Sequence, residues 1–164
     1  MCTTAACSSA PSPGSPPGRR AVTPIREVPA VAAALLVACA VEVALHLLSL
    51  PRTARAVGAP LRQGGGAAPD ARGNARLGPR GRRRVRAVRR VMRHWPFGDT
   101  CLRHALVAGQ RLRRLHPELV VGVRKTGGVV RAHAWLEFET GLYDPLGVAR
   151  AYLPLEPLPG EEGT

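Results

Sequence analysis

Three residues in the second half of the chain have the types that a cysteine nucleophile needs. Cys101 stands at the start of an expected helix, His133 lies inside a strand pattern, and Asp144 ends the next strand pattern. A thiol attacks as its thiolate, so it needs an imidazole to take its proton and a carboxylate to orient that imidazole. The sequence therefore predicts Cys101, His133 and Asp144 as candidate catalytic residues. A first helical turn also favours an anion, which suits both a thiolate and a tetrahedral oxyanion.

Each of these residues also has a plain structural explanation. A cysteine can be inert and buried, a lone histidine is more often a satisfied core or surface residue, and an aspartate before proline often forms a turn. Glu137 and Glu139 are alternatives for the orienting carboxylate, but both lie on the strand of His133 and point parallel to it. His104, three residues after Cys101, is badly placed as a base, and we expect a local or peptide-contact role for it.

The elements that must position these residues follow from apolar periodicity. Residues 95–98 break the preceding helix, and Asp99 or Thr100 can cap the next one. Neighbouring antiparallel strands lie about 4.8 Å apart, which suits an aspartate orienting a histidine on the strand beside it. The expected elements are a helix over residues 101–115 and strands over 119–123, 129–139 and 142–144.

Two further helices are expected before this region. Residues 28–50 form the most apolar run, but Glu42 interrupts it, and a spanning helix needs about 20 mostly apolar residues. We expect a packed helix here, or one that lies on a surface; a lipoprotein signal ending at Cys39 is a weaker alternative. Residues 80–95 predict a basic amphipathic helix, either a solvated face over an apolar seam or a docking surface for an acidic partner.

The charge of the chain is concentrated in its first part. The net charge is +13, yet residues 99–164 are neutral, and residues 1–98 carry 16 arginines against three acidic residues. A basic front can attract an acidic peptide, a membrane surface or a phosphate backbone. The four cysteines form no C-x-x-C pair and no zinc-type spacing, which favours free thiols, a reducing compartment and no metal or cofactor. We therefore expect a cytoplasmic protein, with membrane-surface contact through residues 28–57 left open.

Several sequence blocks carry a family resemblance. They are C-L at 101–102, V-G-V-R-K at 121–125, A-H-A-W-L-E at 132–137 and L-Y-D at 142–144. Residues 80–146 resemble the transglutaminase-like cysteine peptidases of lasso-peptide biosynthesis, the leader peptidases of the B2 type. One departure is His104, which stands where the family often has arginine, while Arg103 comes one residue early.

The resemblance implies an α+β fold with a papain/transglutaminase-like core. In it the catalytic cysteine lies at a helix N-terminus packed on a small antiparallel sheet, and helical segments precede this core. The expected organisation is a disordered tail at 1–27, a helical apolar and basic segment at 28–61, a flexible linker at 62–79, the peptidase core at 80–146 and a proline-rich tail at 147–164.

The resemblance also implies a function. The chain would remove the leader from a ribosomally made precursor peptide, with His133 deprotonating Cys101 and Asp144 holding His133. It implies two partners: a separate winged-helix protein of the B1 type that holds the leader, and an ATP-dependent asparagine-synthetase-like cyclase that uses the freed amine. Residues 1–98 show no strand-rich segment that could replace the winged-helix protein, so we expect it to act in trans.

Two other functions remain open from the sequence. The first is an amidase or amide-forming acyltransferase on the same scaffold, because a fold does not fix a reaction. The second is a non-catalytic basic adaptor that binds nucleic acid or a membrane surface through residues 52–93. Binding by an adaptor would be sensitive to salt and would survive Cys101→Ala.

Overall fold

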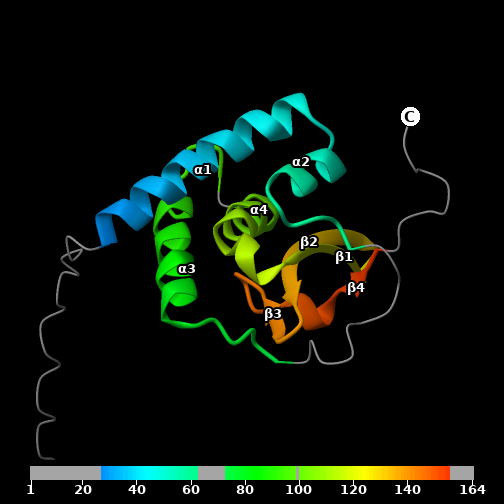
Figure 1. The fold of residues 1–164 in the computed structure, drawn as a ribbon. Coiled ribbons are helices and arrows are strands. Elements are labelled where there is room, and N and C mark those ends of the chain that lie inside the picture. The colour runs from blue at the N-terminus through cyan, green and yellow to red at the C-terminus, as the bar shows by residue number, and fades with distance from the viewer. Residues whose placement is uncertain (1–26, 63–72, 99, 156–164) are drawn as a thin grey trace, which may run out of the picture.

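The computed structural model describes residues 27–62, 73–98 and 100–155. Four α-helices precede or flank a small antiparallel sheet, so the expected α+β class is confirmed (Figure 1). Most of the expected tail at 1–27 and parts of the expected linker at 62–79 and tail at 147–164 lie outside the described residues. The elements are α1 (Val28–Leu47), α2 (Leu50–Ala56), α3 (Pro79–Met92), α4 (Cys101–Leu112), the 3-10 turn η2 (Arg113–Leu115), β1 (Glu118–Thr126), β2 (Val129–Phe138), β3 (Gly141–Tyr143), the 3-10 turn η3 (Ala149–Ala151) and β4 (Leu153–Pro154).

The helices begin and end where local chemistry allows. α1, α2 and α3 each have a proline in the first turn, where a missing backbone N–H costs no helical hydrogen bond. α4 ends three residues before the expected boundary, because the chain tightens into η2 and then turns left-handed at His116, with a φ of 48°. The apolar seam expected in the basic helix is confirmed, with Val85, Val88 and Val91 buried on α3.

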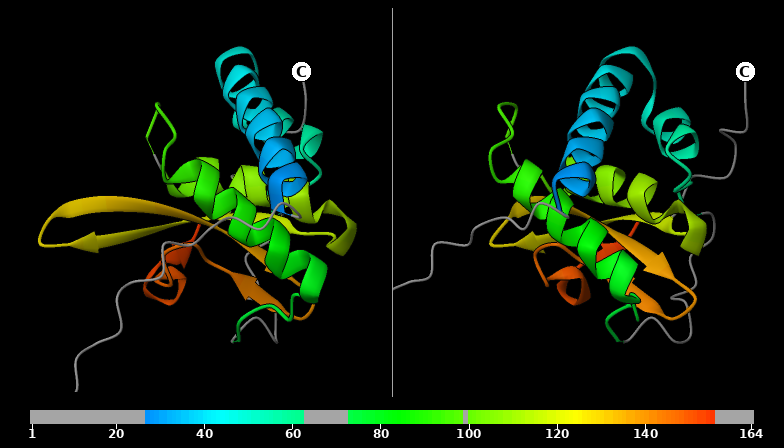
Figure 2. Two further views of the ribbon diagram at one scale, coloured as in Figure 1. Left: turned by 90° about the vertical axis from the view of Figure 1, so that its left-hand side faces the viewer. Right: turned by 60° about the vertical axis from the view of Figure 1, so that its left-hand side comes forward.

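The sheet has the strand order β3-β2-β1-β4, and every neighbouring pair is antiparallel. β1 and β2 form a long hairpin around Gly127 and Gly128, which both have positive φ. The tip of this hairpin projects beyond the helices (Figure 2). The sequence predicted no pattern after residue 145, yet η3 and β4 form there. β4 is only two exposed residues long and contains a proline, so it carries no strand alternation.

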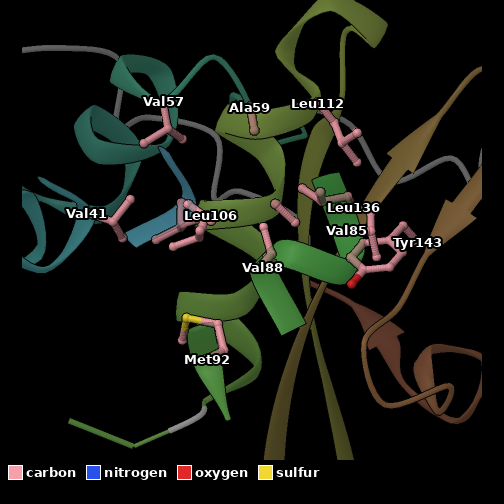
Figure 3. Packing of buried hydrophobic residues seen from close by; sticks show 14 of the residues in the cluster. Val41, Val57, Ala59, Val85, Val88, Met92, Leu106, Leu112, Leu136 and Tyr143 are labelled. Carbon is pink, nitrogen blue, oxygen red and sulfur yellow. The ribbon is translucent and has the colours of Figure 1, made fainter. Parts of the chain in front are cut away.

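One apolar core joins all four α-helices to one face of the sheet. α4 lies in the middle of it, with α1 and α3 on one side and β2 on the other (Figure 1). Figure 3 shows labelled side chains of this core, among them Val41 of α1, Leu106 of α4 and Leu136 of β2. Gly109 allows this approach, because a Cβ there would lie 2.7 Å from the Cβ of Ala59 and 3.5 Å from a methyl group of Leu136. The helical front and the residues around Cys101 therefore share a single core.

α1 is long and apolar enough to cross a membrane by length and composition, a test that buried core helices also pass. In this fold one side of α1 is buried through Ala30, Ala34 and Ala38. Glu42, the residue that interrupts the apolar run, is also buried and forms a bidentate ion pair with Arg103 of α4, at 2.8 and 2.9 Å. Glu42, which interrupts the apolar run of the sequence, therefore joins α1 to α4 in the fold.

Candidate active site

Cys101 is the first residue of α4. Thr100 caps the helix, since its hydroxyl accepts a hydrogen bond from the backbone N–H of Arg103 at 3.4 Å. The cap at Thr100 is therefore confirmed, while Asp99 lies outside the described residues. Cys101 is partly exposed and has a free thiol. The first backbone N–H groups of a helix have no helical acceptor, so they can stabilise a thiolate or a developing oxyanion at this place.

His133 and Asp144 form a buried pair. Nε2 of His133 lies 2.8 Å from Oδ1 of Asp144, and both side chains are only 2% exposed. Oδ1 also accepts the backbone N–H of Leu146 at 2.9 Å, and Oδ2 accepts that of Ala149 at 2.6 Å. These bonds hold the carboxylate in one orientation. They also fix the imidazole so that Nδ1 is the nitrogen left for a reaction, and Nδ1 has no hydrogen-bond partner within the described residues.

The pKa of Asp144 reflects this environment. Burial alone would raise it, but the backbone N–H groups of Leu146 and Ala149 and the contact with His133 outweigh burial. The pKa of Asp144 is therefore lowered below its usual range, and the carboxylate stays ionised at neutral pH. An ionised carboxylate of this kind stabilises the imidazolium that forms when a histidine takes a proton.

Two aromatic rings cover the imidazole of His133. The ring of Trp135 lies 5.9 Å away in a stacked orientation, and the ring of Tyr152 lies 5.2 Å away at a tilt. The guanidinium of Arg124 in turn lies over the Tyr152 ring, 5.2 Å from its centroid. Sequence reasoning missed Tyr152, because the segment after residue 145 has no periodic pattern. Its only signal is an isolated aromatic residue in a proline-rich stretch.

Glu137 is committed to another contact. Its carboxylate accepts a hydrogen bond from the indole N–H of Trp135 at 3.0 Å and pairs with Arg62. Glu137 therefore holds the ring that stacks on His133, and Asp144 holds the imidazole itself. Arg62 was not expected at this site, because it lies 75 residues away in the sequence.

The side chain of His104 is buried and does not lie on the protein surface. Its Nε2 lies 3.1 Å from the hydroxyl of Tyr143, and its side chain is 5% exposed. Of the two roles expected for His104, the structure supports the local contact, which links α4 to β3. The peptide-contact role is wrong because the side chain is buried.

The structure brings His133 and Asp144 together but forms no hydrogen bond from Cys101 to either of them within the described residues. Alternate residues of a strand face opposite sides of a sheet. Leu136 faces α4, where it lies close to Gly109, so His133 is on the sheet face turned away from α4. Cys101 packs against the core cluster on the α4 side.

One edge of β2 is partly free. β3 pairs only with residues Leu136–Phe138 of β2, so the part of β2 before Leu136 has no strand partner on that side within the described residues.

The described residues contain no group of three or more histidine, cysteine, aspartate or glutamate side chains that could hold a metal ion. No curated protein and no solved structure matches the chain. Residues 35–144, about two thirds of the chain, match the family described as the transglutaminase-like superfamily. The match begins inside α1, runs through α4 and strands β1 to β3, and ends at Asp144. Most residues of the common core lie within it. The chain therefore belongs to the transglutaminase-like superfamily.

Proposed function

We propose that this protein is a cysteine peptidase that removes the leader from a ribosomally made lasso-peptide precursor. The observation that carries the proposal is the buried His133–Asp144 pair, 2.8 Å apart, in a transglutaminase-like chain whose Cys101 begins a helix. A buried, oriented imidazole with one nitrogen free is what a thiol nucleophile requires. The leader-peptidase specificity rests on the resemblance of the blocks at 121–125 and 132–137.

In the proposed reaction Nδ1 of His133 takes the proton of the Cys101 thiol. The thiolate attacks the carbonyl carbon at the leader–core junction, and the first N–H groups of α4 stabilise the oxyanion. His133 then gives its proton to the leaving amine of the core peptide, which departs and leaves the leader as a thioester on Cys101. Water, deprotonated by His133, hydrolyses the thioester and restores the thiol.

The proposal includes two partners. A winged-helix protein of the B1 type would present the leader, because the described residues up to 98 form helices and only isolated bridges to the main sheet. An ATP-dependent asparagine-synthetase-like cyclase would use the amine that cleavage releases. Both are separate chains in this proposal, encoded near the precursor.

The test is mass spectrometry of the precursor after incubation with the winged-helix partner and this protein. The native protein should release leader and core, and Cys101→Ala should lower the rate by about 10³-fold or more. Cys39→Ala is the matched control, because Cys39 is an exposed free thiol on α1, and it should cleave like the native protein. Equal trimming by Cys101→Ala would show that the assignment is wrong.

The same experiment separates the amidase or acyltransferase alternative. Such an enzyme would still depend on Cys101, but it would join the acyl group to an added amine, or release ammonia from a side-chain amide, without cutting the precursor at the leader junction. A product mass equal to precursor plus amine minus water or ammonia would favour that alternative over the peptidase.

A further inference from the structure

The outer side of α1 is apolar along its length. Figure 1 shows α1 along the outside of the molecule, with α4 between it and the sheet. The exposed positions recur every three to four residues, so they form one stripe opposite the buried alanines. From Val28 to Leu45 no exposed residue of this helix is charged. The large exposed side chains of this stripe are Val28, Leu35, Leu36, Val43 and Leu47, of which Leu36 and Leu47 are 71% and 75% exposed.

A surface helix of a soluble protein normally turns charged or polar residues to water. α1 instead exposes apolar side chains on one side while it buries small apolar residues on the other. Contiguous exposed apolar patches of this kind mark surfaces that bind another protein or a membrane. The outer stripe of α1 is therefore a docking surface, and the charges around it indicate what it meets.

The helices beside α1 are strongly cationic. The described residues from 27 to 98 include 12 arginines and only two acidic residues. Both acidic residues are paired, Glu42 with Arg103 and Glu27 with Arg86 and Arg90. Exposed arginines lie on both neighbours of α1: Arg52 and Arg55 on α2, and Arg80, Arg82 and Arg86 on α3; Arg89 of α3 is also exposed but lies over the Tyr143 ring of β3.

We infer that the outer stripe of α1 lies in the surface of an anionic lipid bilayer, with the arginines of α2 and α3 at the level of the phosphate groups. An apolar helix face flanked by cations binds anionic bilayers through both apolar burial and electrostatic attraction. The helix lies in the plane of the membrane and does not cross it, because Ala34, Ala38 and Val41 belong to the common core. A spanning orientation would expose that core.

A second copy of the chain is a poor occupant of the same surface. A symmetric contact through α1 would bring two sets of cationic helices together, and like charges repel across an interface. Lipid phosphates supply the opposite charge over a wide area. The inference is independent of the peptidase proposal, because none of the residues in the stripe is near the His133–Asp144 pair in the fold.

Vesicle flotation of the full-length protein tests the inference. Vesicles of phosphatidylcholine with phosphatidylglycerol should carry the protein, while vesicles of phosphatidylcholine alone should carry much less, and added salt should weaken binding. The double variant Leu36→Asn/Leu47→Asn should lower binding at least about tenfold. In the double variant Arg52→Gln/Arg55→Gln, the loss of each arginine at the phosphate level should lower vesicle binding about fivefold.

Matched controls lie in the β1–β2 hairpin. Val129→Asn/Val130→Asn removes two other large exposed apolar side chains, and Lys125→Gln/Arg131→Gln removes two exposed charges; both should bind like the native protein. Circular dichroism confirms that each variant is folded. Equal binding to neutral and anionic vesicles, loss of binding in the hairpin controls, or a lipid-free dimer that Leu36→Asn/Leu47→Asn dissociates would each overturn the inference.

Discussion

At the scale of single residues, the site is organised around the carboxylate of Asp144. Its two oxygens accept two backbone N–H groups and contact His133, and its pKa is lowered against the effect of burial. A carboxyl group whose pKa is lowered by folding stabilises the native state above its ordinary pKa. That contribution is lost as the pH falls through the lowered value. The pair is therefore intact throughout the neutral range in which a peptidase of this type would work.

The site also requires a glycine at position 122. It is the cross-strand partner of His133, and a Cβ there would lie 2.6 Å from the ring of Trp135 and 2.9 Å from the carbonyl oxygen of Leu153. Gly122→Ala should displace Trp135 from His133, with a loss of about 1–3 kcal/mol in unfolding free energy. Leader cleavage should fall as well.

Urea denaturation and leader-cleavage rates measure these two effects. Gly73→Ala is the matched control, because nothing lies within 4 Å of the position its Cβ would take. If Gly122→Ala matched Gly73→Ala in both measurements, the contact between Trp135 and His133 would have no role in the site.

The sequence allowed some of these residues to be predicted and not others. Cys101, His133 and Asp144 have chemically distinctive types next to recognisable elements, so they could be proposed as a set, and the contact between the last two is present. Arg62 and Tyr152 could not be proposed, because their contacts join segments with no shared local pattern. Long-range pairing of this kind depends on the tertiary fold, which periodicity does not describe.

At the scale of elements, α1 and α4 are joined by an ion pair whose carboxylate is buried and whose guanidinium is partly exposed. Arg103 donates two hydrogen bonds to Glu42, and the indole of Trp95 lies 3.3 Å from the same carboxylate. The hydrogen bonds from Arg103 lower the pKa of Glu42 against the effect of burial, and Glu42 raises that of Arg103. The charged residue that breaks the apolar run thus sets how α1 crosses the cysteine helix.

Glu42→Gln should destabilise the fold at neutral pH. Removal of one partner of a fully buried ion pair costs about 3–5 kcal/mol, and we expect about 2 kcal/mol here because Arg103 is partly exposed. The folded pKa of Glu42 is lowered, so the pair stabilises above the ordinary glutamate pKa and this contribution is lost as the pH falls through the lowered value. The difference between native protein and variant should therefore shrink in acid.

Urea denaturation at neutral pH and at about pH 3 measures this difference. Glu139→Gln, at an exposed carboxylate after β2, is the control and should change stability little at either pH. A neutral-pH loss in Glu42→Gln that persisted unchanged in acid would show that the effect comes from packing and not from the charge.

The elements themselves were largely predictable. Strong helical periodicity placed α3, and β-branched runs around a Gly-Gly turn placed β1 and β2 within a few residues. η3 and β4 were not predictable, since both are short and neither has a periodic pattern of its own: β4 is held by pairing with β1, and the Ala149 N–H of η3 is held by Asp144. η3 carries the N–H group of Ala149, and Tyr152 lies between η3 and β4, so this segment completes the site around Asp144.

At the scale of the whole molecule, the two halves of the proposed site lie on opposite faces of one sheet. α4 packs on the sheet with Cys101 at its first residue, and the other face of the same sheet holds His133. The family match over residues 35–144 spans this whole unit, including most of α1. The proposed reaction requires Cys101 and His133 to meet, so that the imidazole takes the proton of the thiol.

The most direct test of that meeting is the rate at which iodoacetamide alkylates Cys101 at about pH 6, followed by mass spectrometry of its peptide. An ordinary thiol is protonated at this pH and reacts slowly. Cys39 in the same molecule serves as the internal control, because it is an exposed free thiol on α1. We predict that Cys101 reacts much faster than Cys39 in the native protein, and that His133→Ala lowers the Cys101 rate about 10²-fold while the Cys39 rate stays unchanged. A Cys101 rate that is the same with and without the imidazole would contradict the account.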